Sequence, residues 1–260
     1  MGGIAVISHA TIVSMVVWIV FSFILFAGLI LFFKRKTGIS VKPLIVGAIG
    51  FIVITQVLEK ALHLVVMTHF PEQMANPWFL GVYGGLAAGV FEEFGRYFLF
   101  IWLLKKYLDY RGGISFGVGW GGIEAVVITL MIAVPYMIFA LMINAGTFEA
   151  TLGTQLPADQ LATLQETLLS QGPSFYLFMG VERFFAALLQ IALSLFVLFA
   201  VVKRKFSYVI YAVFIHAVID FPFAFWQAGY IANLWSVEIY LAVLGLLSLV
   251  FIKKARQLLP

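Results

Sequence analysis

The chain has 260 residues, of which 63% are hydrophobic and only 11% are charged, and it contains no cysteine. A soluble domain carries about 25% charged residues, so the composition excludes that class and is typical of a polytopic membrane protein. The net charge of +4 does not indicate a nucleic-acid partner, because the basic residues gather in the loops between apolar segments. The absence of cysteine excludes disulfides, thiol catalysis and thiolate metal sites.

The apolar segments predict an all-α transmembrane bundle that forms a single integral membrane domain over residues 1–260. Seven segments are each long enough to cross a bilayer. The fourth is longer than a span requires, so we expect it to tilt or to break near Pro135. The predicted spans, in chain order, are residues 8–33, 43–68, 78–104, 113–143, 174–201, 206–228 and 234–252.

Basic residues are distributed unevenly between the loops. All of the 16 Lys and Arg residues except Lys60, Arg96 and Arg183 follow the first, third, fifth or seventh span. The positive-inside rule therefore predicts an outside N-terminus and a cytoplasmic C-terminus. Lys34–Lys36 follow the first apolar segment and no basic residue precedes it, which is the reverse of a signal peptide, so we interpret this segment as a retained span.

One predicted outside loop, residues 144–173, is long. Its leucines follow a helical period between Pro157 and Gln171, which predicts a short amphipathic helix. Such a helix either lies on the membrane surface, or packs on the bundle, or serves as a lid over a substrate site.

The third span holds charged residues in the middle of its apolar run. Glu92, Glu93 and Arg96 lie within five positions, and ionisable groups at that depth cost at least ~2.5–3.5 kcal/mol each, so they usually mark a function. Spacings of three and four residues let both carboxylates reach the guanidinium on one helix face. Two adjacent buried carboxylates do not both ionise cheaply. We therefore expect Arg96 to hold one as an anion while the pKa of the other is raised. A carboxylate with a tuned pKa is what general-base activation of water requires.

Two further pairs are spaced four residues apart on predicted helices, namely Glu59 with His63 and His216 with Asp220. In the second pair, the carboxylate would orient the imidazole or share a ligand site with it. The alternative for all these residues is a structural ion-pair network that joins the helices. The other polar residues within spans include Glu124, Glu182, Arg183 and Gln190.

Small residues are dense beside these carboxylates, in residues 81–89 and 112–122. Small faces let helix backbones approach closely in lipid. The two interpretations are simple helix packing and room for an extended substrate.

Five stretches carry most of the charged intramembrane residues: 57–63 (VLEKALH), 83–96 (YGGLAAGVFEEFGR), 117–125 (GVGWGGIEA), 181–186 (VERFFA) and 216–220 (HAVID). Together they resemble the YhfC family of bacterial intramembrane metalloproteases over nearly the whole chain. That family is allied to the CAAX-protease and Abi superfamily of glutamate-dependent membrane proteases. The glycine-rich approach to the Glu pair is the most specific part of the resemblance.

The resemblance implies hydrolysis of a peptide bond in a membrane-embedded peptide or protein substrate. Glu92 or Glu93 would be the base that activates water, Arg96 would orient it, and His216 with Asp220 would lie on the carbonyl or metal side. A divalent metal such as zinc, held by Glu93, His216 and His63, is one possible cofactor that the resemblance suggests. A supporting polar shell would comprise Glu59, His63, Glu124, Glu182, Arg183, Trp120 and Gln190.

The chain departs from this pattern at two positions, because the resemblance implies a His where Trp120 and Gln190 stand. Trp neither binds a metal nor accepts a proton from water, and Gln is not a base at neutral pH. One alternative is therefore a catalytically inactive relative that binds membrane peptides. In the other alternative, His63 takes the place of a missing histidine in the site. A proton-coupled transporter is a further alternative, since carboxylate–His chains within spans also serve that function.

Overall fold

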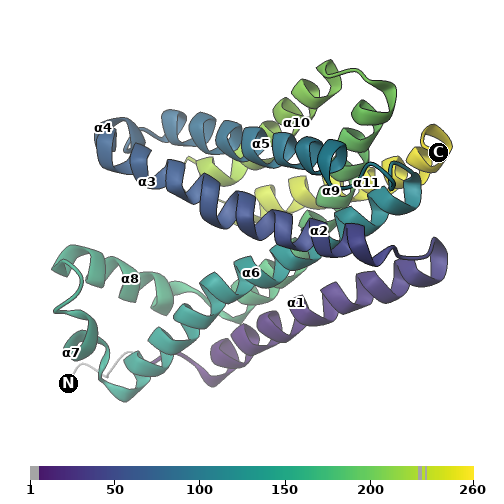
Figure 1. Cartoon of the computed structure of the whole chain (residues 1–260). Helices are drawn as coiled ribbons and strands as arrows, with labels where there is room; N and C mark the ends of the chain where they lie inside the picture. Colours follow the sequence, from purple (N-terminus) through teal and green to yellow (C-terminus); the bar gives the residue numbers. More distant parts are fainter. Residues whose placement is uncertain (1–5, 228–229, 232) are drawn as a thin grey trace. The chain divides into compact units, whose positions relative to one another are not determined.

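The computed structural model describes residues 6–227, 230–231 and 233–260. These residues form helices and connecting turns, and no strand occurs among them (Figure 1). The elements are α1 (His9–Lys36), α2 (Val41–Phe51), a π-helical segment η1 (Ile52–Glu59), α3 (Lys60–His69), α4 (Pro71–Met74), α5 (Pro77–Trp102), α6 (Tyr110–Ala145), α7 (Phe148–Leu152), α8 (Ala158–Ser170), α9 (Pro173–Lys203), α10 (Ser207–Gln227) and α11 (Leu234–Leu258).

Each predicted span coincides with a helical segment, the second with α2, η1 and α3 together. In the described part of the chain, five helical segments are long and apolar enough to cross a membrane: α1, Val41–His69, α6, α9 and α11. The apolar part of α10 is shorter, and α5 carries three charged residues within its length. The all-α polytopic fold is confirmed, while the count of seven crossings stays a prediction.

Two expectations about the fourth span and the loop after it have different outcomes. The α6 helix is continuous from Tyr110 to Ala145 with Pro135 inside it. Of the two expected outcomes, a break at Pro135 is therefore wrong, and a tilt stays a prediction. Proline is tolerated in membrane helices because neighbouring groups and small backbone adjustments satisfy the carbonyl that loses its partner. The amphipathic helix predicted in the outside loop is confirmed as α8.

The chain divides into two compact units: Met1–Leu25 with Ala125–Arg183, and Phe26–Glu124 with Phe184–Pro260. In the first unit, Asn144 joins the chain ahead of α1 to the end of α6. The Ile7 N–H donates to Asn144 Oδ1 at 2.7 Å, and Asn144 Nδ2 donates to the Ile7 carbonyl at 2.9 Å. Leu168 of α8 is fully buried, so this amphipathic helix packs through its leucine face.

In the second unit, α5 lies beside α10 (Figure 1). Gly81, Gly85 and Gly89 form one face of α5, and a Cβ atom added at Gly85 would lie 2.7 Å from the carbonyl oxygen of Ala217 on α10. Only glycine permits this approach, which is how helices associate closely in lipid. The packing interpretation of this glycine-rich stretch therefore holds, and the same spacing of four residues places Glu93 one turn further along the same face.

The start of α5 is fixed by a cap. Asn76 precedes the helix, and its Oδ1 atom accepts the backbone N–H of Trp78 at 2.9 Å. Pro77 follows at the first helical position, where its missing N–H costs nothing. Together these residues set where the helix begins and so the depth at which its charged residues lie.

Candidate functional site

Arg96 is the centre of a buried polar cluster in the second unit. Its guanidinium is 0% exposed. Nη2 donates to Glu92 Oε2 at 2.8 Å, and Nη1 donates to Glu93 Oε1. The two ion pairs predicted from the spacing are therefore present, and the guanidinium bridges the two carboxylates with one terminal nitrogen on each. Hydrogen bonds between charged partners are stronger than those between neutral ones.

Glu92 is held by donors from three helices. Besides Arg96, its Oε2 atom accepts the indole N–H of Trp120 on α6 at 3.0 Å and the amide of Gln190 on α9 at 3.2 Å. Gln190 also accepts a hydrogen bond from Arg96, and the guanidinium carbon lies 4.6 Å from the Trp120 ring centroid. The two side chains that replace the implied histidines are thus both donors to one carboxylate oxygen, as an imidazole N–H could be.

Glu93 has a different environment. It is 0% exposed, and its Oε1 atom lies 2.6 Å from Nδ1 of His216 on α10. Its Oε2 atom is buried and has no hydrogen-bond partner among the residues that the structure describes. One oxygen of Glu93 is therefore fixed by Arg96 and His216, and the other is not bound by any side chain or backbone group in the described ranges.

His216 lies among three carboxylates. Its Nε2 atom is 3.4 Å from Oδ2 of Asp220 and 3.9 Å from Oε1 of Glu92. The imidazole is 4% exposed, whereas the Asp220 side chain is 42% exposed. Because both ring nitrogens face carboxylate oxygens, both can donate only when the imidazole is protonated. In this arrangement the imidazole orients Glu93, and Asp220 connects it to the edge of the cluster.

Glu59 and His63 belong to a second, smaller cluster. His63 Nε2 lies 3.3 Å from Glu59 Oε1, and its Nδ1 lies 2.7 Å from the Tyr83 hydroxyl on α5. Sequence reasoning missed Tyr83, because it is on a different helix and no spacing relates it to the pair. Glu59 is the last residue of η1, and π-helical turns often occur at functional sites. Its charge also repels that of Glu92.

Three further residues are predicted to support the site: Glu124, Glu182 and Arg183. The charge of Glu124, on α6, attracts Arg96, so Glu124 belongs to the surroundings of the cluster. Glu182 and Arg183 form an ion pair with each other and lie in the first unit. Their contribution to the site stays a prediction.

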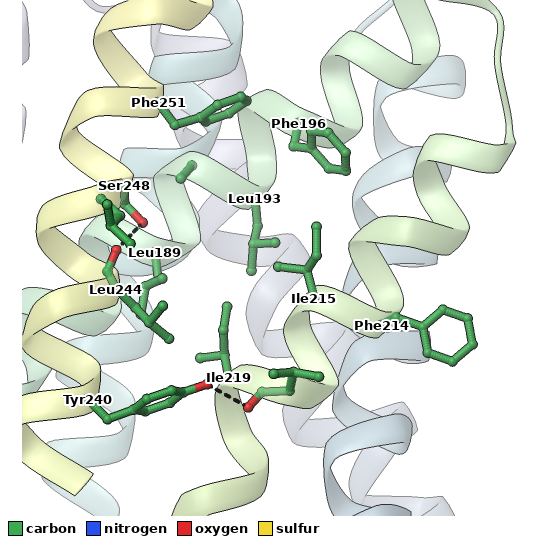
Figure 2. A pocket seen from close by; sticks show the side chains of 13 residues that line it. Leu189, Leu193, Phe196, Phe214, Ile215, Ile219, Tyr240, Leu244, Ser248 and Phe251 are labelled. Atoms are coloured by element: carbon green, nitrogen blue, oxygen red, sulfur yellow. Dashed lines mark hydrogen bonds between the residues drawn. The ribbon is translucent and has the colours of Figure 1, made fainter. Parts of the chain in front are cut away.

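An apolar cavity of about 530 Å³ lies between α9, α10 and α11 in the same unit. Figure 2 shows Ile215 and Ile219 of α10 among the side chains that line it, and the Tyr240 hydroxyl donating to the Val218 carbonyl at 2.9 Å. The helical partner of that carbonyl would be the N–H of residue 222, which is proline. Tyr240 therefore replaces the hydrogen bond that Pro222 removes from α10.

Comparison with known proteins identifies the relatives of this chain. The profile of the family described as "YhfC intramembrane metalloprotease" matches residues 11–241. The chain belongs to this family. It is 38% identical over 239 residues to "Uncharacterized membrane protein YhfC" of Bacillus subtilis (strain 168), covering 91% of this chain and 93% of that protein. No solved structure matches significantly. The relative is named a membrane protein, and the described residues of this chain include five helical segments long and apolar enough to cross a membrane. The chain is therefore a multi-pass integral membrane protein.

The family description implies a metal, so we compare the side chains of the cluster with those that a metal ion requires as ligands. In the described part of the chain, no group of three or more His, Asp or Glu side chains is arranged to hold a metal ion. Glu92 and Glu93 are bound by the guanidinium of Arg96, a cation that occupies the position between them, and His63 is bound to Glu59 and Tyr83. Trp120 and Gln190 supply no imidazole ligand. The residues in this arrangement do not fit zinc, and a site of Glu93, His216 and His63 gains no support from it.

Proposed function

We propose that this member of the YhfC family is an intramembrane endopeptidase in which Glu93 activates the attacking water. The observation that supports this role is the asymmetry of its carboxylate, whose Oε1 atom is held by Arg96 and His216 while its buried Oε2 atom has no partner in the described structure. A general base needs a fixed orientation and a free lone pair toward the water. Glu92 is also one-sided, because Oε2 accepts three hydrogen bonds while Oε1 lies 3.9 Å from Nε2 of His216. Glu93 is favoured over Glu92 because its Oε1 atom lies 2.6 Å from Nδ1 of His216, which fixes its carboxylate more closely.

The proposed reaction uses a single carboxylate twice. Glu93 Oε2 accepts a proton from water while the water oxygen attacks the carbonyl carbon of the scissile peptide bond. The protonated carboxyl then donates this proton to the departing amide nitrogen as the C–N bond breaks. Arg96 and His216 keep the carboxylate in place through both steps, and the half-exposed Asp220 holds the imidazole from the other side.

A catalytically inactive relative that binds membrane peptides is the second candidate. The observation that favours it is the saturation of Glu92 by Trp120 and Gln190, the two side chains that stand where histidines are implied. In this alternative, Arg96 and its two carboxylates are a structural ion-pair centre, and a substrate-like peptide binds without being cut.

Cleavage of a panel of fluorogenic apolar peptides by the purified full-length protein, reconstituted in liposomes, tests the proposal. The comparison includes a variant with Glu92→Gln and Glu93→Gln, and one with Trp120→His and Gln190→His. Cleavage by the wild type that the Glu changes abolish supports a glutamate-dependent protease. Cleavage by the His-containing variant alone contradicts it and supports the inactive relative.

A further inference from the structure

A second cavity, of about 350 Å³, lies at the basic end of the second unit, where the connection from α5 to α6 meets the connection from α9 to α10. The positive-inside rule predicts that this end faces the cytoplasm. Three cationic side chains line the cavity, Lys105 from the first connection and Arg204 with Lys205 from the second. In the part of the chain that the structure describes, no acidic residue lines it. Two loops distant in sequence therefore bring like charges to one cavity.

These three cations have no counter-charge among the residues that the structure describes. None of them makes a side-chain hydrogen bond or an ion pair within the described residues. Asp109, the acidic residue closest in sequence to Lys105, instead accepts the backbone N–H of Gly112 at 2.6 Å at the start of α6. Like charges held near one another repel, and an anion bound between them would offset that repulsion.

The backbone at Arg204 provides an independent indication. Helix α9 ends in a motif in which the Lys205 N–H donates to the Ala200 carbonyl at 3.0 Å and the Arg204 N–H to the Val201 carbonyl at 3.1 Å. This motif places Arg204 in the left-handed region, with φ of 53°, where glycine is the favoured residue. A strained residue whose side chain lines a cavity is a candidate functional residue.

The rest of the lining is apolar. Ile101, Leu108 and Val201 contribute aliphatic surface, and the ring of Phe206 lies 5.4 Å from that of Tyr97. Tyrosine is one of the residues that gather at the membrane interface, at the level of the lipid headgroups. The cavity thus combines a cationic part, suited to a phosphate group, with an apolar part suited to the first carbons of an acyl chain.

We propose that this cavity binds the phosphate group of an anionic ligand, either the headgroup of a phospholipid in the adjoining leaflet or a soluble phosphate ester. Arg204 supplies a planar pair of donors, and Lys105 and Lys205 supply point charges. This site is separate from the Glu93 cluster, and its proposal does not rest on the proteolytic function.

The test measures lipid binding to the purified full-length protein in detergent by native mass spectrometry. The ligands are phosphatidylglycerol, phosphatidylcholine with the same acyl chains, and soluble glycerol 3-phosphate as a competitor. The cavity variant carries Lys105→Gln, Arg204→Gln and Lys205→Gln. The matched control carries Lys36→Gln, Lys106→Gln and Lys253→Gln, which removes the same charge from exposed residues at the same end that do not line the cavity.

Wild type should prefer phosphatidylglycerol to phosphatidylcholine, and the cavity variant should lose at least about ten-fold in affinity for it while the control stays within about two-fold. Competition by glycerol 3-phosphate would identify the phosphate ester alone as sufficient, and its failure to compete would identify the lipid. Equal losses in the cavity and control variants, or no preference for the anionic lipid together with no binding of the soluble ester, would overturn the proposal.

A single change separates folding from binding. Arg204→Gly removes the guanidinium and at the same time suits the left-handed backbone, so its thermal unfolding midpoint should equal or exceed that of the wild type. Weaker binding of phosphatidylglycerol with an unchanged midpoint supports the site. Unchanged binding in a folded Arg204→Gly protein contradicts a role for this side chain.

Discussion

The Nδ1 atom of His216 lies 2.6 Å from Oε1 of Glu93, although 123 residues separate them in the chain. The contact joins α5 to α10 at the end of the glycine face through which these helices pack. Close packing at Gly85 and Gly89 brings the two backbones near enough for a Glu and a His to meet directly. The same glycines that hold the helices together therefore position the carboxylate that we propose as the base.

Replacement of Arg96 should destabilise the protein strongly. Arg96→Met would leave two buried carboxylates without their cation, and removing one partner of a buried ion pair costs about 3–5 kcal/mol. Arg96→Lys keeps the charge but replaces the two separate guanidinium donors by one ammonium group. Its unfolding free energy should lie between those of Arg96→Met and the wild type. Reversible unfolding in mixed micelles measures the free energy. Arg256→Met, at an exposed position near the C-terminus, is the control, and an equal effect of the two Met variants would contradict a buried ion-pair centre.

The indole N–H group of Trp120 should stabilise the folded protein independently of the packing of its ring. Trp120→Phe keeps an aromatic face beside Arg96 but removes the donor to Glu92, so we expect a loss of about 1–3 kcal/mol in unfolding free energy. The variant with Trp120→His and Gln190→His retains an N–H at both positions but leaves a larger void where the fully buried indole lay, so it should lose more than Trp120→Phe. The same unfolding measurement distinguishes them. Equal stability of Trp120→Phe and the wild type would show that the indole hydrogen bond contributes nothing.

The hydrogen bond from Tyr240 should depend on Pro222. Tyr240→Phe leaves the Val218 carbonyl without its donor beside an apolar cavity, which costs about 1–3 kcal/mol. Pro222→Ala restores a backbone N–H at the position that would satisfy this carbonyl. Tyr240→Phe should therefore be nearly neutral in the Pro222→Ala background. A double-mutant cycle with no coupling between the two changes would contradict this explanation.

Cleavage should not depend on a dissociable metal. The carboxylates are bound by Arg96, and the described residues hold no ligand group for a metal ion. We therefore expect peptide cleavage to be unchanged after dialysis against 1,10-phenanthroline or EDTA. A zinc-dependent membrane protease treated in parallel is the control. Loss of activity that added zinc restores would contradict this prediction. It would show that the enzyme uses the metal that the family description implies, and that the cluster rearranges to bind it.

Much of the helical architecture could be predicted from the sequence, because long apolar segments and the distribution of Lys and Arg are direct consequences of the bilayer. The ion pairs of Arg96 also followed from local spacing, since residues three and four apart share a helix face. The continuity of α6 through Pro135 did not follow, because neighbouring groups in a bundle can compensate for the N–H that proline lacks.

The long-range contacts of the cluster could not be predicted in the same way. Trp120 and Gln190 both donate to one oxygen of Glu92, although they lie 28 and 98 residues from it in the sequence and on other helices. No periodicity in the sequence encodes which faces of separate helices meet. Compared position by position with the family pattern, these two side chains count only as missing histidines. Their common function as donors emerges only from the packing of α5, α6 and α9 around Arg96.

The most direct test of the central claim compares Glu93→Gln with Glu92→Gln in peptide cleavage, after both variants have been shown to fold by thermal unfolding. Glu93→Gln removes the proposed proton acceptor and should lower kcat by about 10²-fold or more, with little change in KM. Glu92→Gln keeps Glu93 and its contact with His216, so cleavage should remain measurable. Activity that survives Glu93→Gln but is abolished by Glu92→Gln would contradict the assignment of Glu93 as the base.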